Sequence, residues 1–174
     1  TDVKITLIGG RGHIKHTVGG DFRQASWRAV RQGLMELKRQ NECQLLEPWY
    51  AFHLKVPNDQ VGRAINDIQQ RHGTCELDEA NSQDLTLITG TAPVVGMCDY
   101  AQSVRAYTHG QGQLELVVAG YYPCHNAEDV IRNVNYDPVA DLENTPDSVF
   151  CAHGAGFPVP WNEVPAMAHY PYRK

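Results

Sequence analysis

The sequence predicts an α+β fold, and the order of its apolar patterns leads to this assignment. Between about residues 46 and 122, alternating segments and segments with helical apolar spacing follow one another as β-α-β-β-α-β. A strand-loop-helix pattern precedes this stretch, and a segment rich in proline, glycine and aromatic residues follows it. The central order is that of a ferredoxin-like domain, in which an antiparallel four-stranded sheet carries both helices on one face.

The first 45 residues are predicted to form one strand and one long helix. Val3–Leu7 alternates apolar and polar side chains, which is typical of a strand. A glycine-rich loop over residues 9–20 follows, and Asp21 is predicted to cap the helix, which ends near Arg39. The apolar stripe of this helix comprises Phe22, Ala25, Ala29, Val30, Gly33, Leu34 and Leu37.

The central segment is predicted to contain four strands and two helices. Gly73 is expected to cap the first helix, and Gly110 and Gly112 to end the second. The predicted strands are Trp49–Val56, Thr74–Leu77, Leu85–Thr89 and Leu114–Val118, with a polar turn at Asp78–Asp84, and the predicted helices are Val61–His72 and Met97–Tyr107.

Residues 126–174 are predicted to form an irregular C-terminal extension that packs on the other elements. Ala127–Asn133 is predicted as a short helix. The segment after it contains Phe150, Phe157 and Trp161, which makes it too apolar for a free linker. Met167–Lys174 is expected to fray.

The charge of the chain is distributed unevenly. Residues 1–45 hold eight basic and four acidic residues, a balance of +4, whereas residues 46–174 hold seven and sixteen, a balance of −9, so the total is −5. This asymmetry indicates that only the first part faces a polyanion, although a solvated helix face would give the same pattern. No apolar run reaches the roughly 18–20 residues of a membrane span, and no signal peptide is recognisable.

The sequence offers little for catalysis or metal binding. The five cysteines are odd in number and form no CxxC pair, which favours free thiols in a reducing cytoplasm. His13 with His16, and Cys151 with His153, lack the second pair that a structural metal site needs. No GxxxxGK[ST] motif is present, and Cys151 beside His153 lacks a third, orienting group. We therefore expect no metal, no cofactor and no catalytic residue in this chain.

The loop over residues 9–20 is the candidate binding site. It combines Arg11, His13, Lys15 and His16 with glycines that expose backbone N–H groups. Such a loop can contact phosphates by charge and stack its imidazoles on unpaired bases. The residue types predict RNA contact, with an ordinary polar hairpin loop as the alternative.

Ordered groups of residues carry a family resemblance. The first runs His13-x-x-His16-Thr-Val-Gly-Gly-Asp-Phe-Arg-Gln-Ala-Ser-Trp-Arg-Ala-Val-Arg-Gln-Gly-Leu-Met35. Further matching groups are Leu46-Glu-Pro48, Val61-Gly-x-x-Ile65-x-Asp67-x-x-x-x-x-Gly73, Pro93, Gly96-x-x-x-Tyr100-Ala101, Arg105 and Thr108-His-Gly-Gln-Gly112. Over residues 1 to about 125 the chain resembles the C-terminal third of elongation factor G and of the tetracycline-resistance ribosomal-protection proteins. The tail Ser148-Val-Phe-Cys-Ala-His-Gly-Ala-Gly-Phe157, with Trp161, resembles the latter branch.

The resemblance implies a division of labour. Residues 1–45 would be the C-terminal half of the domain IV arm, a partial ribosomal-S5-like β-α unit that enters the decoding centre. Residues 46–125 would be the ferredoxin-like domain V, near the factor-binding region of the large subunit. The rRNA-binding residues implied by the arm's position are Arg11, His13, Lys15, His16, Arg23 and Arg28. His13 matches a tip histidine of elongation factor G.

The resemblance also implies what this chain lacks. It would be an excised piece without the GTPase domain and without the first half of domain IV, so GTP and Mg²⁺ would bind elsewhere in the parent protein. The chain itself would not be an enzyme. The missing strands would leave apolar surface exposed on the helix at residues 21–39.

Three functions follow as hypotheses. The first is the ribosome-binding C-terminal portion of a cytoplasmic translational GTPase that protects the ribosome from tetracycline. Its partners would be the 16S rRNA decoding centre, through residues 9–20, and the large subunit, through residues 46–125, with neither membrane nor DNA. The alternative is the same portion of an elongation factor G-like GTPase in translocation or recycling. The third is a stand-alone ferredoxin-like binding module, which the fold alone permits.

Overall fold

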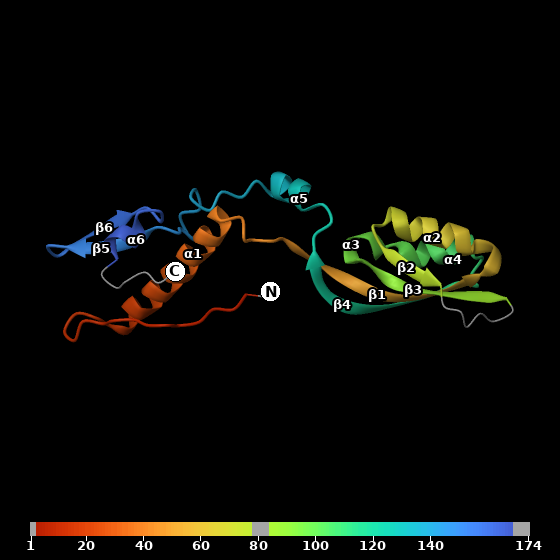
Figure 1. Ribbon diagram of the computed structural model, residues 1–174, viewed down its shortest axis with the longest axis horizontal. Coiled ribbons are helices and arrows are strands. Elements are labelled where there is room, and N and C mark those ends of the chain that lie inside the picture. Colours follow the sequence, from red (N-terminus) through yellow and green to blue (C-terminus); the bar gives the residue numbers. More distant parts are fainter. Residues whose placement is uncertain (1–2, 78–83, 169–174) are drawn as a thin grey trace. The chain divides into compact units, whose positions relative to one another are not determined.

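The computed structural model describes residues 3–77 and 84–168 (Figure 1). The described chain forms two compact units. One unit is Leu45–Asp129, and the other combines the chain before Leu45 with the chain after Asp129. The predicted turn at Asp78–Asp84 lies outside the described residues except for Asp84, as does the predicted frayed end beyond residue 168.

The unit Leu45–Asp129 is built on a four-stranded antiparallel sheet. Its strands are β1 (Leu46–Pro57), β2 (Thr74–Leu77), β3 (Leu85–Pro93) and β4 (Gln113–Pro123), in the order β2-β3-β1-β4. β1 lies in the middle because it pairs antiparallel with both β3 and β4. This order confirms the predicted ferredoxin-like arrangement.

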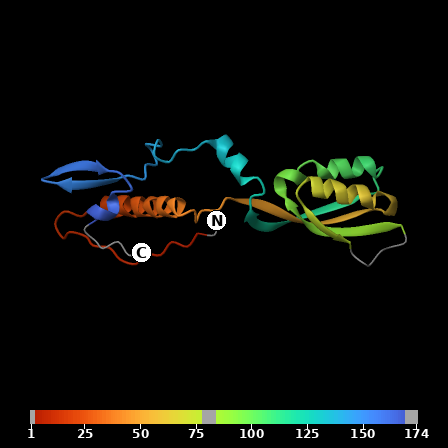
Figure 2. The same ribbon diagram turned by 45° about the horizontal axis from the view of Figure 1, so that its top comes forward.

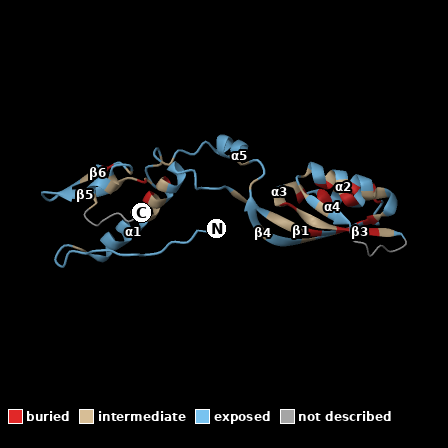
Figure 3. Ribbon diagram, in the orientation of Figure 1, coloured by how far each residue is buried: buried red, intermediate tan, exposed pale blue. Residues whose placement is uncertain are grey.

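Helices cover one face of this sheet, as Figure 2 shows. They are the short 3-10 turn η1 (Asn58–Gln60), α2 (Val61–Gln70), α3 (Val94–Met97) and α4 (Tyr100–Tyr107). On β1, Phe52, Leu54 and Val56 are at most 1% exposed while the residues between them face solvent, as a strand with one covered face requires. The helices complete this core with Ala64, Ile68, Met97, Tyr100, Val104 and Tyr107 (Figure 3).

The predicted helix Met97–Tyr107 corresponds to α4, and a separate short helix, α3, ends at Met97. The chain leaves helical geometry at Asp99, where φ is −111° and ψ is 0°. The carboxylate of Asp99 accepts a hydrogen bond from the Arg71 guanidinium at 3.0 Å. The same guanidinium donates to the Gly96 carbonyl oxygen and lies 4.7 Å from the centre of the Tyr100 ring. Arg71 therefore joins the end of α2 to the break between α3 and α4.

Gly73 takes part in the cap of α2, but the preceding residue holds the left-handed position. The left-handed residue after α2 is His72, with a φ of 60°, while the Gly73 N–H bonds to the Ile68 carbonyl oxygen at 2.9 Å. A Cβ at position 73 would lie 2.8 Å from Cγ2 of Ile68 and 2.9 Å from Cβ of Ala92. Glycine is thus required here because the chain passes close to the core.

In the other unit, the predicted strand Val3–Leu7 does not form. Val3, Ile5 and Leu7 are 60–89% exposed, and the described residues provide no hydrogen-bonded neighbour for them. A strand needs such a neighbour, so the alternating pattern alone is insufficient. α1 (Gly19–Arg39) begins two residues before the predicted cap, and Asp21 instead accepts a hydrogen bond from the Val18 N–H at 2.9 Å.

The C-terminal extension contains more regular structure than predicted. It begins with α5 (Ala127–Val134), continues through the antiparallel pair β5 (Ser148–Ala152) and β6 (Ala155–Val159), and reaches α6 (Val164–Met167). The two-residue turn is His153-Gly154, with φ angles of 52° and 82°. Two consecutive left-handed residues are the geometry of a tight hairpin, which glycine makes favourable.

This extension contacts a polar face of α1. Arg28 donates to the Asp147 carbonyl oxygen at 2.6 Å, and Arg31 donates to Asn144 Oδ1 at 3.2 Å. Gln32 and Met35 are buried on the same side. The predicted apolar stripe remains largely in solvent: Phe22, Leu34 and Leu37 are 38–57% exposed. Figure 3 shows most of α1 as exposed, in agreement with the expected uncovered apolar surface.

Candidate nucleic-acid interface

The loop before α1 contains a closed turn over residues 13–17. The His13 carbonyl oxygen accepts hydrogen bonds from the N–H groups of His16, at 3.3 Å, and Thr17, at 3.0 Å. In return, the His13 N–H donates to Thr17 Oγ1 at 2.6 Å. The hydroxyl of Thr17 therefore fixes the shape of the turn, and the side chains between these two residues project from a defined backbone.

The two histidines of this turn stack on each other. Their ring centroids are 4.7 Å apart, with an angle of 28° between the ring planes. His13 Nδ1 accepts a hydrogen bond from the Lys15 N–H at 3.3 Å, so the proton of the neutral ring is on Nε2. Both residues are exposed, and a stacked pair of this kind offers an aromatic surface to an unpaired base.

The predicted site residues fall into two groups. Arg11, His13, Lys15 and His16 are all exposed and lie within one short loop. Arg23 is exposed on α1, beyond that loop. Arg28 is half-buried and uses its guanidinium on the Asp147 carbonyl oxygen, so it already has a partner inside the protein. The structure therefore gathers four of the six residues in one place.

Ile14, which the sequence-based selection did not include, also lies in this turn. The residue is 102% exposed, and in the sequence it lies between His13 and His16, whose rings stack on each other. An isoleucine so completely in solvent gains nothing from folding, which makes the turn an unusual place for it. Its position between His13 and Lys15 was the one sign in the sequence of an exposed side chain in the loop. An apolar residue in a polar loop is, however, easily assigned to packing.

A second polar surface surrounds the turn between α4 and β4. The Thr108 hydroxyl donates to the Val104 carbonyl oxygen at 2.6 Å and accepts from the Gly112 N–H at 2.8 Å. A Cβ at Gly112 would lie 2.6 Å from Cγ1 of Val104, so this position must be glycine. The turn borders a shallow pocket of 430 Å³, which Arg105 and Glu115 line together with Ala101, Gly110, Gly112, Gln113 and Leu114.

The five cysteines form no disulfide with one another. All five thiols are free. Burial raises the pKa of the Cys75 thiol, which lowers its reactivity. Cys151 and His153 are exposed residues at the end of β5 and in the hairpin turn. No helix in residues 3–77 or 84–168 is long and apolar enough to cross a membrane.

Comparison with known proteins assigns the chain to a family. Residues 44–130, half of the 174, match the family described as Elongation factor G C-terminus. Elongation factor G 1 of Synechocystis sp. is 31% identical over 133 residues, 75% of this chain and 18% of its own length. Elongation factor G 2 of Vibrio parahaemolyticus is 31% identical over 135 residues, 76% of this chain and 19% of its own length.

A third relative carries a more general name. An elongation factor G-like protein of Mycobacterium tuberculosis is 30% identical over 122 residues, 70% of this chain and 16% of its own length. The chain thus spans less than a fifth of the length of these relatives. With a ferredoxin-like sheet and a family match over half of its residues, the chain belongs to the elongation factor G C-terminal family.

Proposed function

We propose that this chain is the ribosome-engaging C-terminal portion of an elongation factor G-like translational GTPase acting in the cytoplasm. The observation that carries the proposal is the exposed turn over residues 13–17, which precedes a domain of the elongation factor G C-terminal family. In this proposal, residues 9–20 contact 16S rRNA at the decoding centre. The unit Leu45–Asp129 contacts the factor-binding region of the large subunit.

The side chains of the loop suit RNA in complementary ways. Arg11 and Lys15 supply positive charge for phosphate oxygens, which dominates affinity and makes it dependent on salt. His13 and His16 supply stacked aromatic faces for an unpaired base. Ile14 supplies an apolar contact for a base or ribose. Because the turn is closed by its own hydrogen bonds, less conformational entropy is lost on binding.

Nucleotide chemistry belongs to another part of the parent protein in this proposal. GTP and Mg²⁺ would bind a GTPase domain, whereas this chain would bind the ribosome and contribute no catalytic residue. The chain is therefore proposed to be a binding portion whose position on the ribosome is controlled by the nucleotide state elsewhere.

The finer proposal is protection of the ribosome from tetracycline. Its support is the tail sequence Ser148–Phe157 with Trp161, which resembles the tetracycline-resistance branch. In this reading, insertion of the loop at the decoding centre dislodges the drug. The rival is a role in translocation or recycling, supported by relatives that are named elongation factor G.

The first experiment measures ribosome binding by the full-length protein. Replacing Arg11, His13, Lys15 and His16 with alanine is expected to weaken binding. Loss of the two cations should lower the slope of log affinity against log salt by about 1.4–1.8. The matched control replaces Lys4 and Lys38, two exposed cations outside the loop and outside the unit Leu45–Asp129. Unchanged binding by the loop variant, or equal weakening by the control, would reject the loop as the contact.

The second experiment distinguishes the two cellular roles. Cells with and without the full-length gene are grown across tetracycline concentrations, and the loop variant is included. Resistance that requires the intact loop supports drug protection. Tetracycline tolerance that is the same with and without the gene, together with translocation or recycling that depends on the gene, supports the rival. Tight binding of a small ligand without any ribosome association would point to a stand-alone module.

A further inference from the structure

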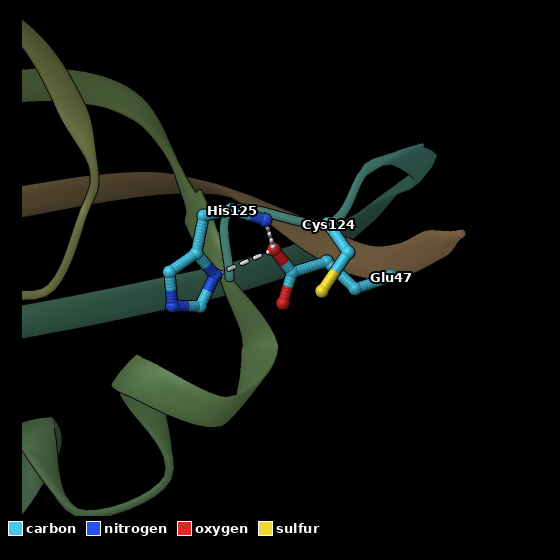
Figure 4. A group of neighbouring side chains, drawn as sticks. All are labelled: Glu47, Cys124 and His125. Atoms are coloured by element: carbon cyan, nitrogen blue, oxygen red, sulfur yellow. Dashed lines mark hydrogen bonds and ion pairs between the residues drawn. The ribbon is translucent and has the colours of Figure 1, made fainter. Parts of the chain in front are cut away.

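Three side chains with metal-binding atoms meet where β1 begins and β4 ends. Glu47 belongs to β1, and Cys124 and His125 follow directly after β4. The strand pairing places Glu47 opposite Tyr122, which brings the three residues together across the chain. Their ligand atoms all lie within 4.8 Å of one another. Figure 4 shows the Glu47 carboxylate between the Cys124 sulfur and the His125 ring.

Hydrogen bonds hold this group in place. Glu47 Oε1 accepts from the His125 N–H at 2.8 Å and lies 2.7 Å from His125 Nδ1. The Cys124 N–H donates to the Leu45 carbonyl oxygen at 2.9 Å, which fixes the thiol-bearing residue to the incoming chain. The side chains of His125 and Glu47 are only 18% and 13% exposed. A group of donors so ordered loses little entropy when it binds an ion.

A ring contact also orients the imidazole of His125. The His72 ring stacks on the His125 ring with centroids 4.3 Å apart and 28° between the planes. His72 has a left-handed backbone, with a φ of 60°, which directs the chain away immediately after α2. The stacking fixes the plane of the His125 ring. His72 is therefore a positioning residue in this cluster.

We propose that Glu47, Cys124 and His125 form a binding site for Zn²⁺. A thiolate, an imidazole and a carboxylate are ligands that Zn²⁺ accepts, whereas Mg²⁺ and Ca²⁺ prefer sites made of oxygen alone. Three protein ligands leave a fourth tetrahedral position for water. The sequence predicted no metal, because Glu47 lies 78 positions before His125 and no local motif joins them.

The proton balance of binding is defined by the present contacts. The Cys124 thiol, which donates to Asn126 Oδ1 at 3.3 Å, loses its proton to solvent as its sulfur bonds the metal. The contact between Glu47 Oε1 and His125 Nδ1 is replaced by two bonds to the ion. In the neutral imidazole, the proton that Nδ1 donates to Glu47 moves to Nε2 as Nδ1 becomes the ligand, so the ring still carries one proton. One proton is thus released for each Zn²⁺ bound to the neutral imidazole form.

Bound Zn²⁺ would cross-link two strands at one end of the ferredoxin-like sheet. Bound metal would hold the first residues of β1 to the last residues of β4, in addition to the backbone pairing and the Trp49–Tyr122 ring contact that already join them. Because the folded unit alone brings the three ligands together, Zn²⁺ stabilises it by mass action. This inference does not depend on the proposed ribosomal function.

The test uses the reduced 174-residue chain. Titration with Co²⁺, a spectroscopic substitute, is expected to give a thiolate-to-cobalt charge-transfer band at one equivalent. Zn²⁺ should displace Co²⁺, raise the melting temperature and slow alkylation of Cys124 by iodoacetamide, as mapped by mass spectrometry. A large excess of Mg²⁺ should do none of these. Cys124→Ser is expected to abolish the band and weaken Zn²⁺ binding by about tenfold or more.

Other thiols provide the matched control. The triple variant Cys43→Ser, Cys98→Ser and Cys151→Ser removes the exposed cysteines outside the cluster and should keep the band. Loss of the band in this variant, or a Cys124→Ser variant that still binds one equivalent, would overturn the proposal. Equal Zn²⁺ protection of every exposed thiol from alkylation would also overturn it, and that measurement needs no variant that must fold.

Discussion

The Arg28 guanidinium donates a hydrogen bond to the Asp147 carbonyl oxygen at 2.6 Å, joining residues 119 positions apart. The carboxylate of Asp147 in turn accepts a hydrogen bond from the backbone N–H of Trp161 at 2.9 Å. Asp147 therefore connects α1, through its carbonyl, to the chain that follows the β5–β6 hairpin, through its side chain. The C-terminal extension is ordered against a basic face of the helix, while the apolar face of the same helix remains exposed.

Replacing Arg28 with alanine is expected to loosen this extension. Loss of a charge-assisted hydrogen bond at a half-buried position should cost about 1 kcal/mol of local stability. Amide hydrogen exchange should accelerate in residues 144–161, with little change in the unit Leu45–Asp129. Arg23→Ala, at an exposed position on the same helix, is the control and should leave exchange in the extension unchanged. Equal exchange in both variants would show that Arg28 does not hold the extension.

Gln32 lies on this buried face and is only 5% exposed. Neither Nε2 nor Oε1 of its amide has a hydrogen-bond partner among the described residues. Burying an amide without partners costs free energy, so Gln32→Leu is expected to stabilise the α1 unit by about 1–2 kcal/mol. Hydrogen exchange of α1 measures the change. Gln24→Leu, at an exposed site, should stay within about 0.5 kcal/mol. A destabilised Gln32→Leu would mean that the amide has a partner in solution, such as a buried water.

The sequence predicted the elements whose apolar pattern can be recognised within the element itself. The alternation of Phe52, Leu54 and Val56 directly reports the covered face of β1, and the element order then determines the sheet. The strand prediction at Val3–Leu7 was wrong because a strand also needs a partner, which the alternating pattern cannot supply. The hairpin at residues 148–159 was missed because glycine and proline obscure its period of two.

The candidate loop could be selected from residue types, whereas its geometry could not. Basic and imidazole side chains near glycines indicated RNA contact. The stacking of His13 on His16 and the hydroxyl of Thr17 that closes the turn depend on backbone angles. The use of Arg28 within the protein depends on a contact far away in the sequence, as does the meeting of Glu47 with His125. Nonlocal contacts of this kind leave no pattern in a single sequence.

Gly112 and Gly62 offer a matched pair for testing close packing. A Cβ at Gly112 would lie 2.6 Å from Val104 Cγ1 and 2.7 Å from Thr108 Oγ1, whereas nothing lies within 4 Å of one at Gly62. Gly112→Ala is therefore expected to destabilise the unit Leu45–Asp129 by about 1–3 kcal/mol. Gly62→Ala, in α2, should stabilise it by up to about 1 kcal/mol. Urea unfolding followed by Trp49, the one tryptophan of this unit, measures both changes.

Similar unfolding midpoints for the two alanine variants would contradict this assignment of Gly112. A loss of stability in Gly112→Ala without a change in the urea dependence would support it, because the unfolding transition would then expose the same surface. The result bears on the second polar surface, since the Thr108–Gly112 turn borders the pocket lined by Arg105 and Glu115.

Tyr100 gives the ferredoxin-like unit a defined response to high pH. Its hydroxyl is buried and lies 3.4 Å from both the Ala64 carbonyl oxygen and the Tyr107 hydroxyl. Burial raises the pKa of Tyr100 well above its usual value, chiefly because the phenolate would lose its hydration, and the hydrogen bond with Tyr107 adds to the shift. In the unfolded chain the same hydroxyl loses its proton at a pH of about 10.

The sign of the pH dependence follows from proton binding. Above a pH of about 10 the folded unit still holds this proton while the unfolded chain has released it, so stability falls as pH rises. Below that pH the contribution is fully present. Tyr100→Phe removes the titrating group, and its unfolding free energy should fall less steeply than that of the wild-type chain between pH about 9.5 and 11. Urea unfolding of both proteins across this range measures the difference. Parallel pH profiles would show that the hydroxyl ionises as readily in the folded unit as in the unfolded chain, and that its burial against Ala64 and Tyr107 does not persist in solution.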